Sequence, residues 1–201
     1  MRKWIMVVLF AVGLMVLNND SYAGLVNVAA SSNGGTISGY SGTFNGAGLS
    51  TLIDEVFLPK GTQWQTGTVW WKDDESYYID ISFNNVYKIK ELVVQADDND
   101  AYTLLYWNSK SSTWDTLWDV PNYDSLGWGM LTRPDPDDNS KHYVLSSPVI
   151  TNKIRIKAAS GDDMYALSEV QAYAPVPVPN TIWLLFSGLI PLGIFLRVRK
   201  A

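Results

Sequence analysis

Hydrophobic and polar residues alternate in several segments between residues 24 and 174, which is the pattern of β-strands with one buried face. In residues 78–83, Ile79, Ile81 and Phe83 fall on one face and polar side chains on the other. The same alternation occurs in residues 91–96, 101–107, 143–149, 153–158 and 168–173. Clusters of Asn, Asp, Gly and Pro separate these segments. The pattern therefore predicts an all-β domain built as an antiparallel sandwich.

Two stretches lack this alternation. Residues 31–50 contain six Gly and five Ser, which predicts a flexible loop region near the start of the domain. Residues 119–140 are rich in Pro, Asp and Gly, and we expect a second long loop there.

The chain begins with the three parts of a secretory signal peptide, over residues 1–23. A positively charged start precedes an apolar run from Ile5 to Leu17, and small residues precede a cleavage site predicted between Ala23 and Gly24. The alternative is a membrane anchor, but this run is short against the ~20 residues that a spanning helix needs.

The chain ends in a Pro-rich spacer at residues 175–181, an apolar segment at 182–196 and a basic tail at 197–201. As a helix, the apolar segment would be ~22 Å long, against ~30 Å of membrane hydrocarbon. Three basic residues follow it and would hold that end in the cytoplasm: Arg197, Arg199 and Lys200. The sequence therefore predicts a short C-terminal hydrophobic helix that is marginal as a permanent anchor.

The order of these three parts, over residues 176–200, resembles the PEP-CTERM protein-sorting signal. Pro177 and Pro179 match the family's prolines, whereas Val178 stands where its glutamate usually lies. The resemblance implies a Gram-negative bacterium and an exosortase-type processing enzyme as partner. It also implies at least transient anchoring in the inner membrane, then delivery to the cell surface or an extracellular polysaccharide matrix. A plain C-terminal anchor is the alternative.

Composition removes several classes of protein. With 47% hydrophobic and 13% aromatic residues, the chain is too apolar for disorder. It has no Cys and a single His, which excludes disulfide scaffolds and multi-His metal sites. Residues 24–179 hold 10 basic and 19 acidic side chains, a net charge of −9, so nucleic acid is not an expected partner.

Little in the sequence supports catalysis. His142 is the only imidazole, and no nucleophile motif accompanies it. Two acids paired across a cleft for glycoside hydrolysis cannot be located from one sequence. We therefore expect a protein that is not an enzyme, and keep a glycan-processing enzyme as the remote alternative.

The strand segments of the domain resemble the discoidin, or coagulation-factor C-type, family. The resemblance is carried by residues 78–83, 86–94, 102–106, Thr113-Trp114, 153–157 and 167–173. It covers about residues 25–174 and implies a jelly-roll sandwich of the galactose-binding-like type.

Many members of that family hold a structural calcium ion. At the matching places this chain has Asp54, Thr62 and Glu169, so the resemblance implies that these three side chains bind calcium. Glu55 departs from the family's usual glycine. The alternative is that Asp54 and Glu169 are ordinary turn and strand-end residues.

The sequence carries nine Trp and eleven Tyr, and several lie in predicted loops. On the 119–140 loop, Trp128 could stack on a sugar ring while Arg133 binds its hydroxyl groups, with Tyr123 nearby. Core packing is the competing role for any single Trp. We expect an exported, non-enzymatic carbohydrate-binding module whose partner is extracellular polysaccharide. The main alternative is a structural matrix or surface protein without a small-ligand site.

Overall fold

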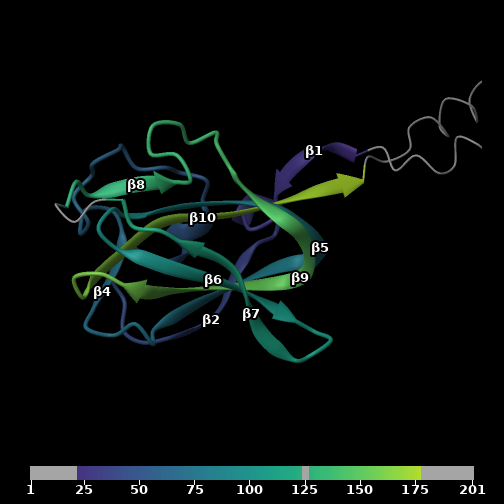
Figure 1. Ribbon diagram of the computed structural model, residues 1–201, viewed down its shortest axis with the longest axis horizontal. Coiled ribbons are helices and arrows are strands. Elements are labelled where there is room, and N and C mark those ends of the chain that lie inside the picture. The colour runs from purple at the N-terminus through teal and green to yellow at the C-terminus, as the bar shows by residue number, and fades with distance from the viewer. Residues whose placement is uncertain (1–21, 124–126, 178–201) are drawn as a thin grey trace, which may run out of the picture. The chain divides into compact units, whose positions relative to one another are not determined.

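The computed structural model, drawn in Figure 1, describes residues 22–123 and 127–177. One compact unit comprises Leu25–Pro175, and a second comprises Met1–Gly24 with Val176–Ala201, most of it outside the described residues. The strands are β1 (Tyr22–Asn27), β2 (Thr36–Ser41), β3 (Asn45–Gly46), β4 (Val69–Lys72), β5 (Tyr78–Asp97), β6 (Ala101–Asn108), β7 (Thr113–Val120), β8 (Met130–Arg133), β9 (Tyr143–Ser160) and β10 (Met164–Pro177). Two 3-10 helices, η2 (Ser31–Asn33) and η3 (Leu49–Ile53), lie in the connections.

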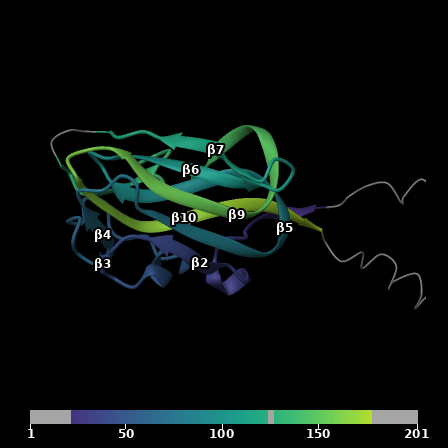
Figure 2. The ribbon, with the colours of Figure 1, turned by 90° about the horizontal axis from the view of Figure 1, so that it is seen from below.

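The long strands β5 and β9 each take part in both halves of the sandwich. Residues 78–82 of β5 pair with β2 and β9, whereas residues 91–97 pair with β8 and β10. The β5–β9 register shifts between residues 82 and 87, where an irregularity lets the strand bend. Strand β9 also pairs with β6, which pairs with β7, and β10 pairs with β4. Figure 2 shows β6 and β7 on one side of the molecule and β3 and β4 on the other.

Aromatic rings join aliphatic rows from both halves in the core. Trp71 on β4 and Tyr165 on β10 are buried, with ring centroids 5.5 Å apart. Tyr102 on β6 is also buried, and its hydroxyl accepts the N–H of Ala166 at 3.0 Å. A ring whose polar tip is hydrogen-bonded can be buried without penalty, so these contacts fix how the two halves face each other.

All six segments with alternating polarity lie inside observed strands, so the all-β sandwich is confirmed. The two loop predictions are wrong in part. Within residues 31–50, β2 pairs with β5 despite its Gly and Ser content, and within residues 119–140, β8 pairs with the end of β5. Both are short edge strands whose hydrogen bonds come from a distant partner, which local composition does not reveal.

The predicted terminal segments lie almost entirely outside the described residues, including the apolar segment 182–196 and the basic tail 197–201. Two of their predicted boundaries fall within strands. The cleavage site before Gly24 falls within β1, and β10 continues to Pro177, so it takes in the first residues of the predicted spacer. Proline is tolerated there because the pairing of β10 with β5 ends at Tyr173, so these positions need not donate to that ladder. In the part of the chain that the structure describes, no helix is long and apolar enough to span a membrane.

Candidate functional site

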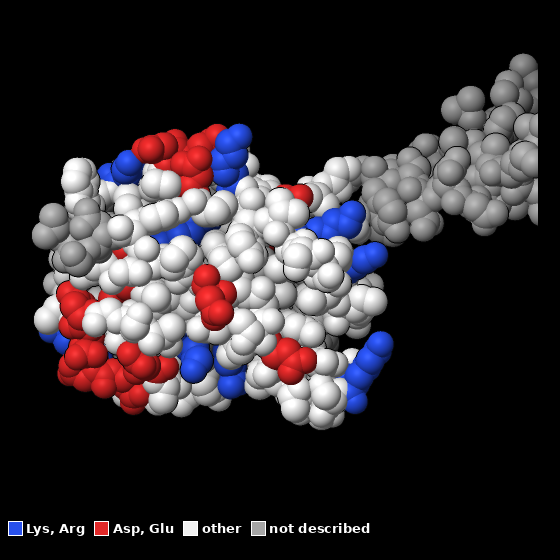
Figure 3. Space-filling view, in the orientation of Figure 1, with Lys and Arg blue, Asp and Glu red and all other residues white. Residues whose placement is uncertain are grey.

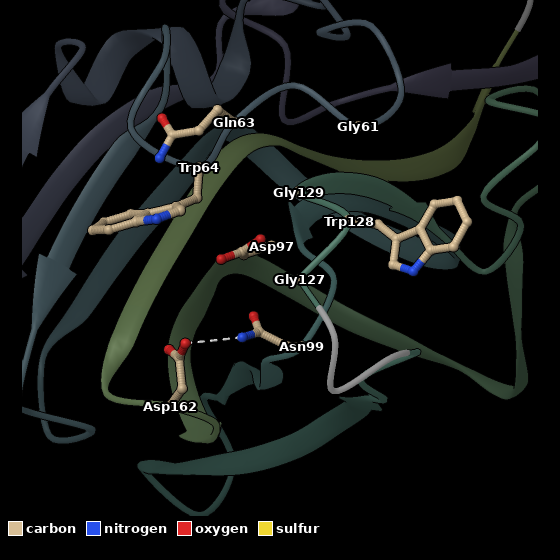
Figure 4. A pocket seen from close by; sticks show the side chains of 9 residues that line it. All are labelled: Gly61, Gln63, Trp64, Asp97, Asn99, Gly127, Trp128, Gly129 and Asp162. Carbon is tan, nitrogen blue, oxygen red and sulfur yellow. Dashed lines mark hydrogen bonds between the residues drawn. The ribbon is translucent and has the colours of Figure 1, made fainter.

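A pocket of about 320 Å³ opens at one end of the compact unit, where four connections meet. It is lined by Gly61, Gln63, Trp64, Asp97, Asn99, Gly127, Trp128, Gly129 and Asp162. Figure 4 shows Trp64 and Trp128 on opposite sides of the pocket, with Asp97 and Asn99 between them, Asp162 below Trp64, and the Trp128 indole directed away from these polar side chains. The lining residues come from the connections before β4 and β8 and from the β5–β6 and β9–β10 turns.

The β5–β6 turn holds the loop that carries Trp128. The carboxylate of Asp98, which is fully buried, accepts the backbone N–H of Trp128 at 2.8 Å and that of Gly129 at 3.0 Å. These are charge-assisted bonds to main-chain donors, so they fix the backbone at the base of the indole.

The same loop is also joined to the connection before β4. The N–H of Met130 donates to the carbonyl of Thr62 at 2.8 Å, and the N–H of Gly61 donates to the carbonyl of Met130 at 2.9 Å. Gly129 has a φ of 86°, and a Cβ there would lie 2.3 Å from the Thr62 carbonyl oxygen. Only glycine fits this close approach of two backbones, which brings the two sides of the pocket together.

Arg133 does not reach the pocket surface, so its predicted role as a ligand contact is wrong. The residue is 0% exposed. Its guanidinium donates to the carbonyls of Ala96 (2.6 Å), Asp97 (2.5 Å), Leu131 (2.9 Å), Asp98 (3.1 Å) and Pro121 (3.2 Å). A buried cation needs its donors satisfied, and here the backbone of the β5–β6 turn satisfies them. Arg133 therefore positions that turn from behind.

The two predicted aromatic contacts remain at the surface. Trp128 is 63% exposed and lines the pocket. Tyr123 is 41% exposed, and its hydroxyl donates to the carbonyl of Pro134. The Arg133 guanidinium lies 5.4 Å from the centre of the Tyr123 ring. Tyr123 thus packs over the buried arginine next to the pocket, while Trp128 belongs to the pocket itself.

Acidic groups dominate the floor of the pocket. Burial and the neighbouring Asp98 raise the pKa of Asp97 to about 6. Burial, with Asp97 and Asp162, raises the pKa of Asp100 to about 7. The amide of Asn99 donates to Asp162 at 3.0 Å, which leaves its buried Oδ1 without a donor. Figure 3 shows acidic side chains gathered at the end of the molecule where β4 and the β9–β10 turn lie.

No protein-family model matches the sequence, and no curated protein is similar to it. Solved structures do match. The family 32 carbohydrate-binding module of Streptococcus pneumoniae EndoD superposes with a TM-score of 0.50 at 12% identity, over 74% of this chain and 99% of that module. The chain has the fold of a family 32 carbohydrate-binding module.

Two further matches differ in how much of the other chain they cover. SpGH29 matches this module fold with a TM-score of 0.50 at 11% identity, over 75% of this chain and 28% of that one. The family 32 module of C. perfringens NanJ, solved in complex with galactose, matches with a TM-score of 0.45 at 13% identity, over 75% of this chain and 99% of that module.

The predicted calcium ligands of the module fold are only partly brought together. Glu169 on β10 is 0% exposed, and burial, with Asp54 as the nearest raising charge, raises its pKa to about 8. Its Oε1 accepts from Gln171 at 3.0 Å, and its Oε2 is buried without any donor. Thr62 makes its contacts elsewhere, donating to the Pro59 carbonyl at 2.6 Å.

These residues fit a cation at Glu169 only with help from backbone oxygens. Within the described residues, no three His, Cys, Asp or Glu side chains converge closely enough to hold a metal ion by themselves. A buried carboxylate oxygen without a donor beside a second acid is nevertheless a suitable place for a hard cation. Glu169 and Asp54 would supply two side chains, and carbonyl groups would have to supply the rest.

Much of the pocket is not predicted from the sequence. The sequence indicates no functional role for Trp64, Asp97, Asn99 or Asp162. In the structure all four line the pocket. The density of Asp and Asn in two turns was the available signal, but only pairing of β5, β9 and β10 places those turns side by side.

Proposed function

We propose that this protein is an exported, non-enzymatic carbohydrate-binding module and that it binds its ligand in the pocket between Trp64 and Trp128. The single observation that carries the proposal is the pocket itself, in which two indoles flank converging polar side chains at the loop end of a module fold. Loops at the end of a β-sandwich are where such scaffolds place binding residues.

The chemistry of the lining suits a sugar. The C–H face of a pyranose ring is apolar and stacks on an aromatic plane, as Trp128 offers with 63% of its surface exposed. Hydroxyl groups of the same ring donate hydrogen bonds to acceptors such as Asp97, Asp162 and the Asn99 carbonyl oxygen. A pocket of about 320 Å³ lies at the lower end of the range for small-ligand sites, enough for one or two sugar units.

Binding and not catalysis is the proposed role, and extracellular polysaccharide is the proposed partner. The lining residues within the described ranges include no imidazole and no nucleophile with a neighbouring base. The alternative of a purely structural matrix protein gives no reason for a pocket held open by buried charged groups.

A Trp128→Ala variant tests this proposal. We expect the purified protein to bind oligosaccharides in calorimetry or on a glycan array, and the variant to lose binding at least ~ten-fold while keeping its melting temperature. The control is Tyr40→Ala, because Tyr40 is 60% exposed but lies on β2, away from the pocket. Absence of binding to every glycan class, or equal binding by Trp128→Ala, would remove the proposal.

We further propose that a structural calcium ion is held at Glu169 and Asp54. Such an ion would neutralise the buried carboxylate and cross-link β10 to the segment after η3. Glu169 then supplies the anchoring oxygen, its Oε2, which is buried and accepts no hydrogen bond from the described residues.

Export and sorting are proposed from the terminal segments alone. Cleavage before Gly24 would release a secreted protein, and an exosortase-type enzyme would process the C-terminal signal at the inner membrane before release to the surface or matrix. The mass of the protein isolated from its organism tests both events. An intact mass for the whole chain, recovered from the cytosol, would overturn this part.

A further inference from the structure

We propose that the pocket selects sugars that carry a protonated amine, so that the ligand is a polysaccharide with free hexosamine units. This inference rests on the proposed carbohydrate-binding function and names the substrate class of that site. It is carried by a pocket floor that contains acceptors and negative charge, in a pocket that Trp64 and Trp128 also line.

The described residues that line the pocket carry negative charge. They include two carboxylates, Asp97 and Asp162, and none of them is Lys or Arg. Arg133 is near, but its guanidinium donates to main-chain carbonyls and does not line the pocket. Burial and repulsion from Asp98 outweigh the attraction of Arg133, since the pKa of Asp97 is raised to about 6. A ligand that brings positive charge would relieve this repulsion.

Hydrogen-bonding capacity in the floor points the same way. The side-chain N–H of Asn99 donates a hydrogen bond to Asp162, and the Oδ1 of Asn99 is buried and accepts no hydrogen bond from the described residues. Asp97 is 4% exposed, and within the described part of the chain its Oδ1 accepts the N–H of Asp98, at 3.1 Å. The group that would satisfy these oxygens is therefore compact, with several hydrogen-bond donors and no acceptor. An ammonium group has three donors and no acceptor.

Other sugar classes fit this floor less well. A uronic acid would bring a third carboxylate against Asp97 and Asp162. An N-acetyl group has one N–H donor and one carbonyl acceptor, so its carbonyl oxygen would face the acceptor oxygens of the pocket floor. A neutral hydroxyl group can donate one bond but leaves the charge of the pocket unbalanced. The amine alone satisfies both the geometry and the charge, and an indole face nearby adds attraction for a cation.

A divalent metal ion is the competing occupant, and the donor set disfavours it. Calcium needs six to eight oxygen ligands. The described lining supplies only two carboxylates, Asp97 and Asp162, well short of that number. Among the described residues, no cluster of three metal-binding side chains forms here.

The test compares two ligands that differ only in the amine. Calorimetry at about pH 6.5, where Asp97 is mostly ionised, would measure binding of a glucosamine tetrasaccharide and of its fully N-acetylated counterpart. We expect the amine form to bind at least ~ten-fold more tightly, as for one added charged hydrogen bond. Asp97→Asn and Asp162→Asn should each lose most of this preference while their circular dichroism stays unchanged.

The matched control is Asp119→Asn, which removes an equal charge from an exposed position on β7, outside the pocket. It should keep the preference. An equal loss in Asp119→Asn would show that the amine is attracted by net charge alone and would overturn the inference.

The remaining outcomes separate this inference from the proposed function. Trp128-dependent binding of the N-acetylated tetrasaccharide at equal or higher affinity would overturn the inference and leave the carbohydrate-binding proposal in place. Binding that a chelator abolishes would assign the carboxylates to a metal ion and also overturn it. No binding of either oligosaccharide, or of any other glycan, would remove both.

Discussion

Replacing Arg133 by Met tests whether this residue supports the pocket from behind, as the structure places it, or contacts a ligand. The substitution keeps a long unbranched side chain and removes the guanidinium. Five main-chain carbonyls within 3.2 Å then lose the guanidinium as a donor, including that of Asp97, whereas the Asp98 carbonyl keeps the N–H of Tyr123 at 2.8 Å.

The expected destabilisation follows from the burial of these groups. Hydrogen bonds to a charged donor are each worth ~1.5–3 kcal/mol, but Met restores some apolar packing and the buried charge is no longer desolvated. Removing one partner from a buried charged network typically costs ~3–5 kcal/mol, and we take that range for Arg133→Met. In a domain of this size the melting temperature should fall by about 10 °C.

Urea unfolding followed by tryptophan fluorescence measures this change. Arg133→Lys should recover only part of the loss, because one ammonium group has three donors in place of five. Lys157→Met controls for the loss of one positive charge at a partly exposed strand position and should stay within ~0.5 kcal/mol. A stability of Arg133→Met within about 1 kcal/mol of the unaltered protein, combined with lost glycan binding, would refute the structural role.

Three further predictions concern the pocket and its surroundings. Gly129→Ala should destabilise the domain by ~1–3 kcal/mol and weaken glycan binding. Gly127→Ala should destabilise it less, because Gly127 also has a positive φ but a Cβ added there would have nothing within 4 Å. Chemical denaturation of both variants would show whether the close approach at Gly129 matters. Because the folded-state pKa values of Asp97 (about 6) and Asp100 (about 7) lie above 3.8, the stability they contribute is complete below about pH 4 and lost as the pH rises through those values. Thermal melts in chelator should therefore show a fall between about pH 4 and 7 that Asp97→Asn reduces, and a fall of equal size in that variant would contradict the assignment. Calcium at a hundred times its dissociation constant should stabilise the protein by ~2.7 kcal/mol, and it should not stabilise Glu169→Gln. Melting temperatures that calcium leaves unchanged in both proteins would reject the calcium site.

The strands of this protein could be predicted from its sequence because their signal is local. Ile79 and Ile81 alternate with polar residues, and a strand with one buried face requires that alternation whichever strand it pairs with. Short edge strands such as β2 and β8 escaped prediction, since their residues resemble loop residues and their hydrogen bonds come from β5.

The candidate site shows the same division. Trp128 could be selected from the sequence, because a Trp in a Gly-rich loop has no strand face to bury it. Arg133 was assigned wrongly, since its place on β8 against the end of β5 decides that its guanidinium turns inward. Nothing near Asp97 in the sequence indicates that the β9–β10 turn will bring Asp162 beside it.

The sequence by itself determined the all-β class, the approximate strands and the one exposed indole of the pocket, because each depends on neighbours a few residues away. Only the tertiary structure decided which loops share the pocket, which acids face one another and which arginine is buried. Those properties depend on contacts between segments that lie more than thirty residues apart, such as the hydrogen bond from the Gly129 N–H to the Asp98 carboxylate, and the local pattern of polar and apolar residues does not indicate such contacts.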